Sequence, residues 1–101
     1  MDKTDLQSDI GTKEKFEEPM DYNVILLNDD FTTMEFVVYI LKMIFHKSDS
    51  EAYNIMMSVH KNGSGLAGTY SYDIAITKRN EVLKLAQANK FPLVCLVKEA
   101  R

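Results

Sequence analysis

The fold of this chain is decided by a stretch that reads Val24-Ile25-Leu26-Leu27-Asn28-Asp29-Asp30-Phe31-Thr32-Thr33-Met34-Glu35. The apolar part predicts a strand over about 22–27, because it is short and lies between Pro19 and a polar run. Thr32 and Glu35 have the spacing of a capping box, so we expect a helix to begin at about Thr33. Three hydrogen-bond acceptors therefore follow a buried strand directly, and this arrangement calls for a functional explanation.

The rest of the chain supplies two more helices and two more strands. The first helix is expected to end at about Phe45 and is apolar almost all round. Ser48 and Glu51 repeat the capping box and predict a second helix that ends at Gly63, which can take the left-handed turn. A strand over 64–72, a helix over 73–89 and a last strand over 93–97 complete the order βααβαβ. This order predicts an α+β domain with a three-stranded antiparallel sheet and three helices.

Periodicity indicates which residues of the later helices face the core. The second helix has a stripe at i, i+3, i+4 and i+7 spacing, and the third helix is expected to turn four residues inward. These residues are Ala52, Ile55, Met56 and Val59 in the second helix, and Ala75, Val82, Leu83 and Ala86 in the third.

Length and charge divide the chain into an arm and one domain. The chain has 101 residues, enough for one modest core. Residues 1–21 carry seven acids and three lysines, so the remaining residues are nearly neutral at +1. We expect a flexible N-terminal arm over 1–20 and a core domain over 21–101. The absence of a strongly basic segment argues against a nucleic-acid partner. We also expect the protein to be a monomer.

The single cysteine and the short apolar runs indicate a cytoplasmic protein. Cys95 lies in an apolar run and cannot form an internal disulfide, which fits a packing role in a reducing compartment. The acidic N-terminus does not have the pattern of a signal peptide. The longest apolar stretch, 36–45, is far shorter than the ~20 residues of a membrane span. We therefore expect no membrane partner. We also expect no cofactor.

Three uses of the acceptor cluster and the apolar helix after it can be weighed from the residues alone. Asp29, Asp30 and His60 could serve a small metal- or carboxylate-dependent hydrolase, although no nucleophile or close-spaced ligand pattern accompanies them. The two aspartates could instead bind backbone N–H groups of their own loop. The apolar first helix could also be an interface with another protein, one that does not select its partner by the partner's N-terminal residue.

A fourth use accounts for both the acceptors and the apolar residues beside them. Amide oxygens, carboxylates and neutral imidazoles can all accept hydrogen bonds from a cationic amine. Methionine suits a pocket that takes several side chains, because its thioether adapts to their shape. The free N-terminus of a protein that begins with a bulky apolar residue has both chemical parts.

Two blocks of sequence resemble the ClpS adaptor family. The first block is residues 24–37, which consists of the stretch quoted above and the next two residues, Phe36 and Val37. The second is Ile55-Met56-Met57-Ser58-Val59-His60-Lys61-Asn62-Gly63, with further similarity at 68–70, 75–78 and Pro92-Leu93. The resemblance covers about residues 20–99. It implies a non-enzymatic adaptor that binds proteins beginning with Leu, Phe, Tyr or Trp and delivers them to a ClpA-type AAA+ unfoldase of the Clp protease.

The resemblance also implies roles for residues of the substrate site. Asn28, Asp29 and His60 would hold the substrate α-amino group, and Asp30 belongs to the same motif. The side-chain pocket would have Thr32 at its rim and would be lined by Met34, Val37, Met56, Val59 and Leu93.

The partner surface implied by the resemblance departs from the family pattern. Asp73 and Lys78 would face the N-terminal domain of the unfoldase, and the N-terminal arm would enter the unfoldase during delivery. Asp73 and Ile76 stand where the family usually has glutamates, and Thr33 stands where it usually has proline. The departures leave the substrate side intact and alter the partner contact.

Overall fold

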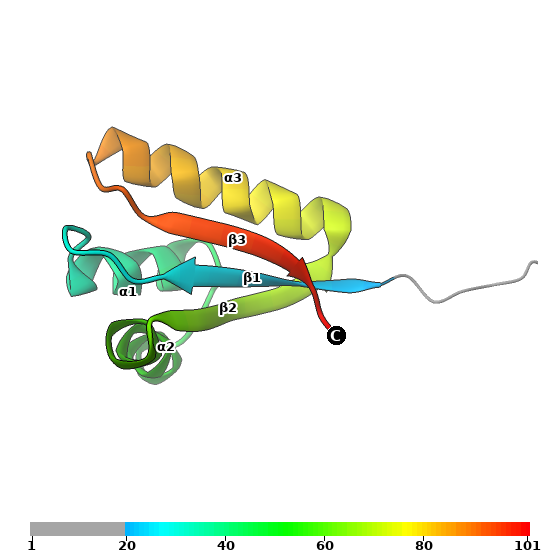
Figure 1. Cartoon of the computed structure of the whole chain (residues 1–101), viewed down its shortest axis with the longest axis horizontal. Coiled ribbons are helices and arrows are strands. Elements are labelled where there is room, and N and C mark those ends of the chain that lie inside the picture. Colours follow the sequence, from blue (N-terminus) through cyan, green and yellow to red (C-terminus); the bar gives the residue numbers. More distant parts are fainter. Residues whose placement is uncertain (1–19) are drawn as a thin grey trace, which may run out of the picture.

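A three-stranded antiparallel sheet forms the centre of the fold in the computed structural model, which describes residues 20–101. The elements, in chain order, are β1 Asp21–Leu27, α1 Met34–Met43, α2 Asp49–Asn62, β2 Ser64–Ser71, α3 Tyr72–Ala88 and β3 Val94–Glu99. The predicted order βααβαβ and the antiparallel sheet are confirmed. The strands lie in the order β2-β1-β3, as Figure 1 shows, so the first strand of the chain is the central one.

The register brings the end of β1 beside the start of the other two strands. Leu27 lies opposite Ser64 on β2 and opposite Val94 on β3. At the other end of β1, Asp21 lies opposite Ser71, which directly precedes α3. The acceptor stretch and the start of α3 therefore lie at opposite ends of the sheet.

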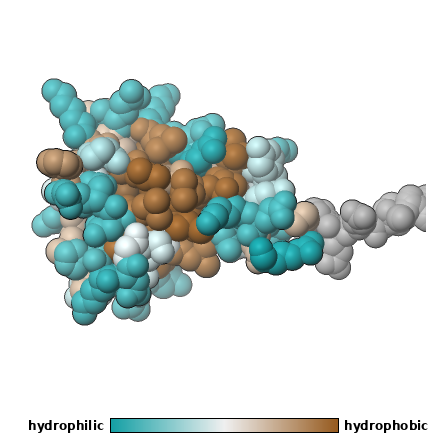
Figure 2. Space-filling model, viewed as in Figure 1, coloured by the Kyte–Doolittle hydropathy of each residue, from teal (hydrophilic) through white to brown (hydrophobic). Residues whose placement is uncertain are grey.

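The two faces of the sheet have different surroundings. Val24 and Leu26 are fully buried and belong to the core cluster, to which all three helices contribute. Side chains alternate along a strand, so Ile25 points to the opposite face, where Leu66 is 50% exposed and Val94 is 42% exposed. Figure 2 shows apolar side chains gathered in the middle of the view that Figure 1 presents. One sheet face thus holds the core, and the other is open and apolar.

The start of α1 differs from the prediction. Thr33 is the N-cap, and its hydroxyl accepts a hydrogen bond from the Phe36 N–H at 3.1 Å. The predicted capping box of Thr32 and Glu35 is wrong, because the Thr32 N–H, which would donate to the Glu35 side chain in such a box, donates to Asp29 Oδ1 at 2.7 Å. The Thr32 hydroxyl also donates to the Asp29 carboxylate. A charged acceptor binds a hydroxyl donor more strongly than a neutral one does. The helix also ends at Met43, two residues before the predicted end.

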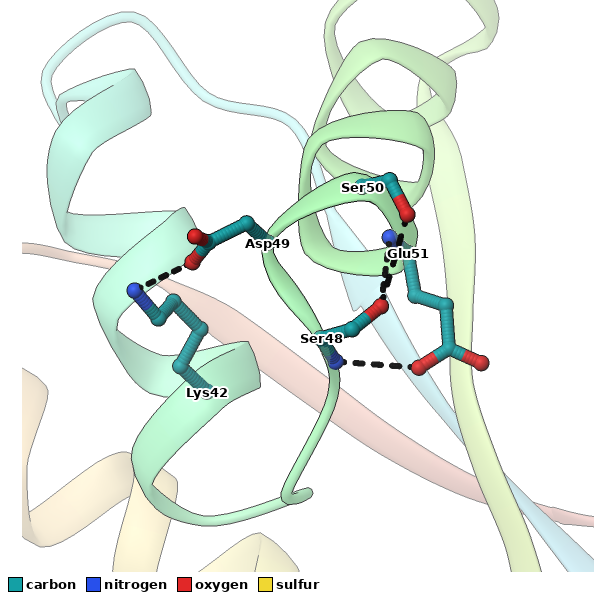
Figure 3. Close-up of polar contacts among 5 residues, drawn as sticks. All are labelled: Lys42, Ser48, Asp49, Ser50 and Glu51. Carbon is teal, nitrogen blue, oxygen red and sulfur yellow. Dashed lines mark hydrogen bonds and ion pairs between the residues drawn. The ribbon is translucent and has the colours of Figure 1, made fainter.

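The connection from α1 to α2 is tight and is shown in Figure 3. His46 has a φ of 56° and turns the chain after the C-cap of α1. The predicted capping box at α2 is confirmed, because Glu51 N donates to Ser48 Oγ at 3.2 Å and Ser48 N donates to Glu51 Oε1 at 2.9 Å. An ion pair between Lys42 and Asp49 joins the two helices across this turn.

Two glycines bring the end of α2 against the sheet. Gly63 ends α2 with a φ of 92°, as predicted. At Gly65 a Cβ atom would lie 2.7 Å from Val59 Cγ2 and 2.9 Å from the Ile55 carbonyl oxygen, so only glycine allows this approach of α2 to β2. The Asn28 N–H donates to the Gly63 carbonyl at 2.9 Å. The end of β1 is thereby bound to the end of α2.

Helix α3 packs on the sheet through small residues. Ala75, Val82 and Ala86 are buried, as predicted. Leu83 was expected to face inward but is 38% exposed, because it lies about 100° around the helix from Val82.

The predicted N-terminal arm, residues 1–20, lies outside the described residues apart from Met20. Within residues 20–101, the helices are too short or too polar to cross a membrane.

Candidate functional site

A cavity of about 590 Å³ opens where β1 ends, between the start of α1 and the last turns of α2. Its lining combines polar groups from the 28–33 loop with apolar side chains from both helices. The lining residues are Asn28, Asp29, Asp30, Phe31, Thr32, Thr33, Met34, Glu35, Val37, Met56, Val59 and His60. A volume of this size suits a small-molecule or peptide ligand.

Asp29 organises the loop that forms the polar side of the cavity. Its Oδ1 accepts hydrogen bonds from the Phe31 N–H at 2.8 Å and the Thr32 N–H at 2.7 Å. Its Oδ2 accepts from the Thr32 hydroxyl at 2.6 Å. These three bonds fix the turn between β1 and α1. Asp29 thus binds backbone N–H groups of its own loop, which was one of the alternatives weighed from the sequence.

The surroundings of Asp29 favour its charged form. Partial burial disfavours the carboxylate, but hydrogen bonds from the Thr32 hydroxyl and from the Thr32 and Phe31 N–H groups outweigh it, so the pKa of Asp29 lies below its usual value. Asp29 is therefore a carboxylate at neutral pH.

Three further polar side chains reach the cavity, two from the loop after β1 and one from α2. Asn28 and Asp30 are exposed on the loop, and His60 is exposed in the last turn of α2. The hydrogen bond from the Asn28 N–H to Gly63 holds the loop close to that turn. Residues that are 32 positions apart in the chain thus share one cavity.

The charged lining is acidic. Asp29, Asp30 and Glu35 contribute carboxylates, whereas His60 is the only basic residue among the lining side chains. Such a cavity attracts a cationic group and repels an anionic one.

The opposite wall is apolar and largely closed to solvent. Val37, Met56 and Val59 are 5%, 6% and 3% exposed, whereas Met34 is 44% exposed. Their contact with the cavity follows from helix spacing, since Met34 and Val37 are three apart on α1, as are Met56 and Val59 on α2. An apolar ligand group could enter between the two helices beside Met34.

The predicted substrate-site residues come together, with one exception. Asn28, Asp29, Asp30, His60, Thr32, Met34, Val37, Met56 and Val59 all line the cavity. Leu93 does not line it. This residue is 4% exposed and belongs to the core cluster, which also contains Val37, Met56 and Val59. Leu93 can therefore support the wall, but it is not on its surface.

Three lining residues were not predicted. Phe31 is 73% exposed at the mouth of the cavity, and Thr33 and Glu35 lie beside it. Phe31 follows the acceptor cluster directly in sequence, and a bulky apolar residue in a polar loop was the signal that could have found it. Glu35 had been assigned to a capping box.

Metal and thiol chemistry find little support in the described part of the chain. Residues 20–101 contain no cluster of three or more potential metal ligands. Cys95 is 5% exposed on β3, and burial raises the pKa of its thiol to about 12, against a smaller lowering effect of Arg79. A thiol held in its protonated form is a poor nucleophile.

Asp73 and Lys78 lie on α3, away from the cavity lining. Asp73 is exposed in the first turn of the helix. The Lys78 amine donates to the Ile44 carbonyl at 2.7 Å and lies over the rings of Phe45 and Tyr70, at 5.8 and 5.3 Å from their centroids. Lys78 therefore ties α3 to the end of α1 and to β2.

Comparison with protein families gives one match that spans most of the chain. Residues 17–96 match the family described as "ClpS: ATP-dependent Clp protease adaptor protein ClpS".

Individual proteins give the same result. The chain is 55% identical over 91 residues to the ATP-dependent Clp protease adapter protein ClpS of Clostridium acetobutylicum. The aligned region covers 90% of each of the two chains. It is 54% identical over 95 residues to the protein of that name from Treponema denticola. The aligned region covers 92% of this chain and 94% of the relative.

A solved structure has the same fold. Agrobacterium tumefaciens ClpS2 bound to L-phenylalaninamide superposes with a TM-score of 0.78 at 38% identity, over 81% of this chain and 99% of the other.

Proposed function

The chain belongs to the ClpS family of adaptor proteins of the ATP-dependent Clp protease, and on this basis we propose that it binds proteins with a bulky apolar N-terminal residue. The N-terminal residues are Leu, Phe, Tyr and Trp, and the bound proteins are delivered to a ClpA-type AAA+ unfoldase in the cytoplasm. As a member of an adaptor family the protein is not an enzyme, and the hydrolase hypothesis for Asp29, Asp30 and His60 is not supported.

One observation carries this proposal. Acceptors and a negative charge line one side of the cavity, and apolar side chains line the other. L-phenylalaninamide, the compound bound to the similar ClpS2 structure, has a free α-amino group and an apolar side chain on one carbon. A ligand with these two parts matches the two sides of the cavity.

The α-amino group binds to Asn28, Asp30 and His60 in this proposal. Each offers an acceptor, and a charge-assisted hydrogen bond contributes about 1.5–3 kcal/mol. The Asp29 carboxylate already accepts three hydrogen bonds from its own loop. We therefore assign Asp29 chiefly to shaping the site and Asp30 to providing the charge that faces the amine.

The first side chain of the substrate enters between α1 and α2. Met34, Val37, Met56 and Val59 surround it, with Thr32 at the rim and Leu93 supporting the wall from the core. Burying a large apolar side chain contributes about 1.5–3 kcal/mol. Met34 is the exposed member of this wall, so it can move to admit side chains of different shape.

Delivery requires a second surface, which we place at the start of α3. Asp73 is exposed there, whereas the Lys78 amine is held by Ile44 and two rings. Asp73 is thus the stronger candidate for direct contact with the N-terminal domain of the unfoldase. Lys78 supports that surface by fixing α3.

Peptide binding tests the substrate part of this proposal. Fluorescence anisotropy of a labelled peptide that begins with Phe should show saturable binding. The same peptide with an acetylated N-terminus, or with Ala as its first residue, should bind at least tenfold more weakly, because each lacks one of the two parts. Equal affinities for the free and the acetylated peptide would exclude the amine site.

A further inference from the structure

A second cavity adjoins the first and is bounded by four residues. Its volume is about 330 Å³, and it is lined by Met34, Glu35, Val38 and Met56. Met34, Glu35 and Met56 also line the first cavity, so Val38 is the one lining residue that belongs to the second cavity alone. Apart from Glu35, the lining is apolar.

The helix geometry explains why two cavities share one wall. Val37 and Val38 are neighbours on α1 and point about 100° apart. Val37 lines the first cavity and Val38 the second, while Met34 lies three and four residues before them. Met34, Glu35 and Met56 therefore lie on the boundary that the two cavities share.

We propose that the second cavity binds the side chain of the third residue of the substrate. This proposal rests on the proposed function, in which the first side chain occupies the first cavity. In an extended peptide, residues one and three point to the same side, about 6.6–6.8 Å apart, and residue two points away. A methionine side chain between them makes two van der Waals contacts, which need roughly 7–8 Å in all, so the first and third side chains would diverge slightly around Met34.

The lining also defines the kind of side chain that this subsite takes. Val38, Met34 and Met56 favour an apolar residue of medium size, such as Leu, Ile or Met. The two methionines can adjust to its shape. Glu35 borders the cavity and disfavours an acidic residue at the third position.

The peptide as a whole would therefore be read at two positions. The first residue provides the amine and the side chain that are essential for binding, and the third residue adjusts the affinity. Substrates that share the same first residue would differ in affinity according to their third residue.

Two matched peptide series test this inference with the wild-type protein. The first series is Phe-Ala-Xaa and the second is Phe-Xaa-Ala, each with Xaa as Ala, Leu or Asp and a common labelled tail. At the third position, Leu should bind about fivefold more tightly than Ala, and Asp should bind more weakly than Ala. The second position should show a much smaller preference for Leu.

Variants then connect the preference to the second cavity. Val38→Thr keeps the shape of the side chain but makes it polar, so the advantage of Leu over Ala at the third position should fall to less than twofold. Glu35→Gln should reduce the penalty for Asp. Met43→Ser, a change at a 57% exposed position of the same helix, should leave both preferences unchanged.

The outcomes separate this inference from the function on which it rests. Equal binding of all third residues, or a Leu preference that survives Val38→Thr, would overturn the subsite while leaving the first-residue site standing. A Leu preference confined to the second position would also overturn it. Failure of the wild-type protein to bind any of the Phe-starting peptides would overturn both proposals.

Discussion

Asp29 and Asp30 are adjacent in sequence but have different surroundings. Asp29 accepts three hydrogen bonds from Phe31 and Thr32, whereas Asp30 is exposed at the cavity. The first carboxylate has most of its bonding capacity occupied within the loop. The second is free to act on a ligand through its charge.

Substitution of each aspartate should separate these roles. Asp30→Asn should weaken binding of a Phe-starting peptide about tenfold or more, because it removes a charged acceptor, and should leave the unfolding midpoint in urea almost unchanged. Asp29→Ala should lower the free energy of unfolding by about 1 kcal/mol or more, because it leaves loop donors without their partner, and should weaken binding as well.

Peptide anisotropy and urea unfolding of the two variants provide the measurements. Asp21→Asn, at an exposed position at the far end of β1, is the control for a general effect of charge. Full affinity in Asp30→Asn together with lost affinity in a stably folded Asp29→Ala would reverse the assignment.

Cys95 should make stability depend on alkaline pH. Burial raises the pKa of its thiol to about 12, whereas the unfolded value is 9.0. The folded state therefore holds the proton more firmly, and stability that is complete below pH 9 decreases as the pH rises toward 12, by up to about 1.4 kcal/mol per pH unit. Cys95→Val should show a smaller loss between about pH 8 and about pH 10 in urea unfolding.

Alkylation of the thiol offers an independent check. Iodoacetamide should label Cys95 slowly in the native protein at neutral pH and rapidly in denaturant, because the thiolate is the reactive form. Equal labelling rates under both conditions would contradict the burial of the thiol.

The residues of the cavity could be predicted to different degrees. Asn28, Asp29 and Asp30 could be singled out because three polar side chains directly after an apolar strand are conspicuous in a sequence, whereas the place of His60 beside them was implied by the family resemblance. Leu93 was misplaced because the surface and the interior of an apolar wall have the same composition. Only the packed structure distinguishes the two.

At the level of elements, the two capping boxes show where local patterns suffice. Ser48 and Glu51 have no competing partner before them among the hydrogen bonds of the described chain, and their predicted bonds form. Thr32 and Glu35 have the same spacing, but Asp29 lies three residues before Thr32 and binds its N–H and hydroxyl. The helix therefore starts one residue later, with Thr33 as its cap. This competition depends on the path of the loop, which spacing alone does not contain.

The caps of α1 and α2 should have similar effects on stability and different effects on function. Thr33→Ala and Ser48→Ala should each lower the free energy of unfolding by about 1 kcal/mol. Thr33 lines the cavity, so its loss should also weaken peptide binding. Ser48 caps the start of α2, whereas the cavity residues of that helix are Met56, Val59 and His60, so its loss should leave binding intact.

Urea unfolding and anisotropy on the same two variants test this pair of predictions. Ser48→Ala is the matched control, since it removes a hydroxyl cap without touching the cavity. Weaker peptide binding in Ser48→Ala would show that α2 stability as a whole controls the site. Unchanged binding in Thr33→Ala would show that the start of α1 is held by other contacts.

For the whole molecule, the sheet separates the proposed substrate site from the proposed partner surface. The cavity follows Leu27 at one end of β1, and α3 begins after Ser71, which pairs with Asp21 at the other end. Figure 1 shows these two ends of the sheet apart. The seven residues of β1 span roughly 20 Å. We therefore expect that a substrate in the cavity and an unfoldase domain at the start of α3 can be bound at the same time.

This separation predicts that partner binding can be removed without loss of substrate binding. Asp73→Ala should reduce capture of the N-terminal domain of a ClpA-type unfoldase in a pull-down, while the affinity for a Phe-starting peptide stays within twofold of wild type. Glu81→Ala removes an exposed acid from the same helix and should change neither. Equal loss in both variants would indicate a general effect of charge on α3, and full capture by Asp73→Ala would place the partner surface elsewhere. Because the two sites share no residue, a saturating peptide should also leave capture by the wild-type protein unchanged, whereas competition between peptide and domain would contradict their separation.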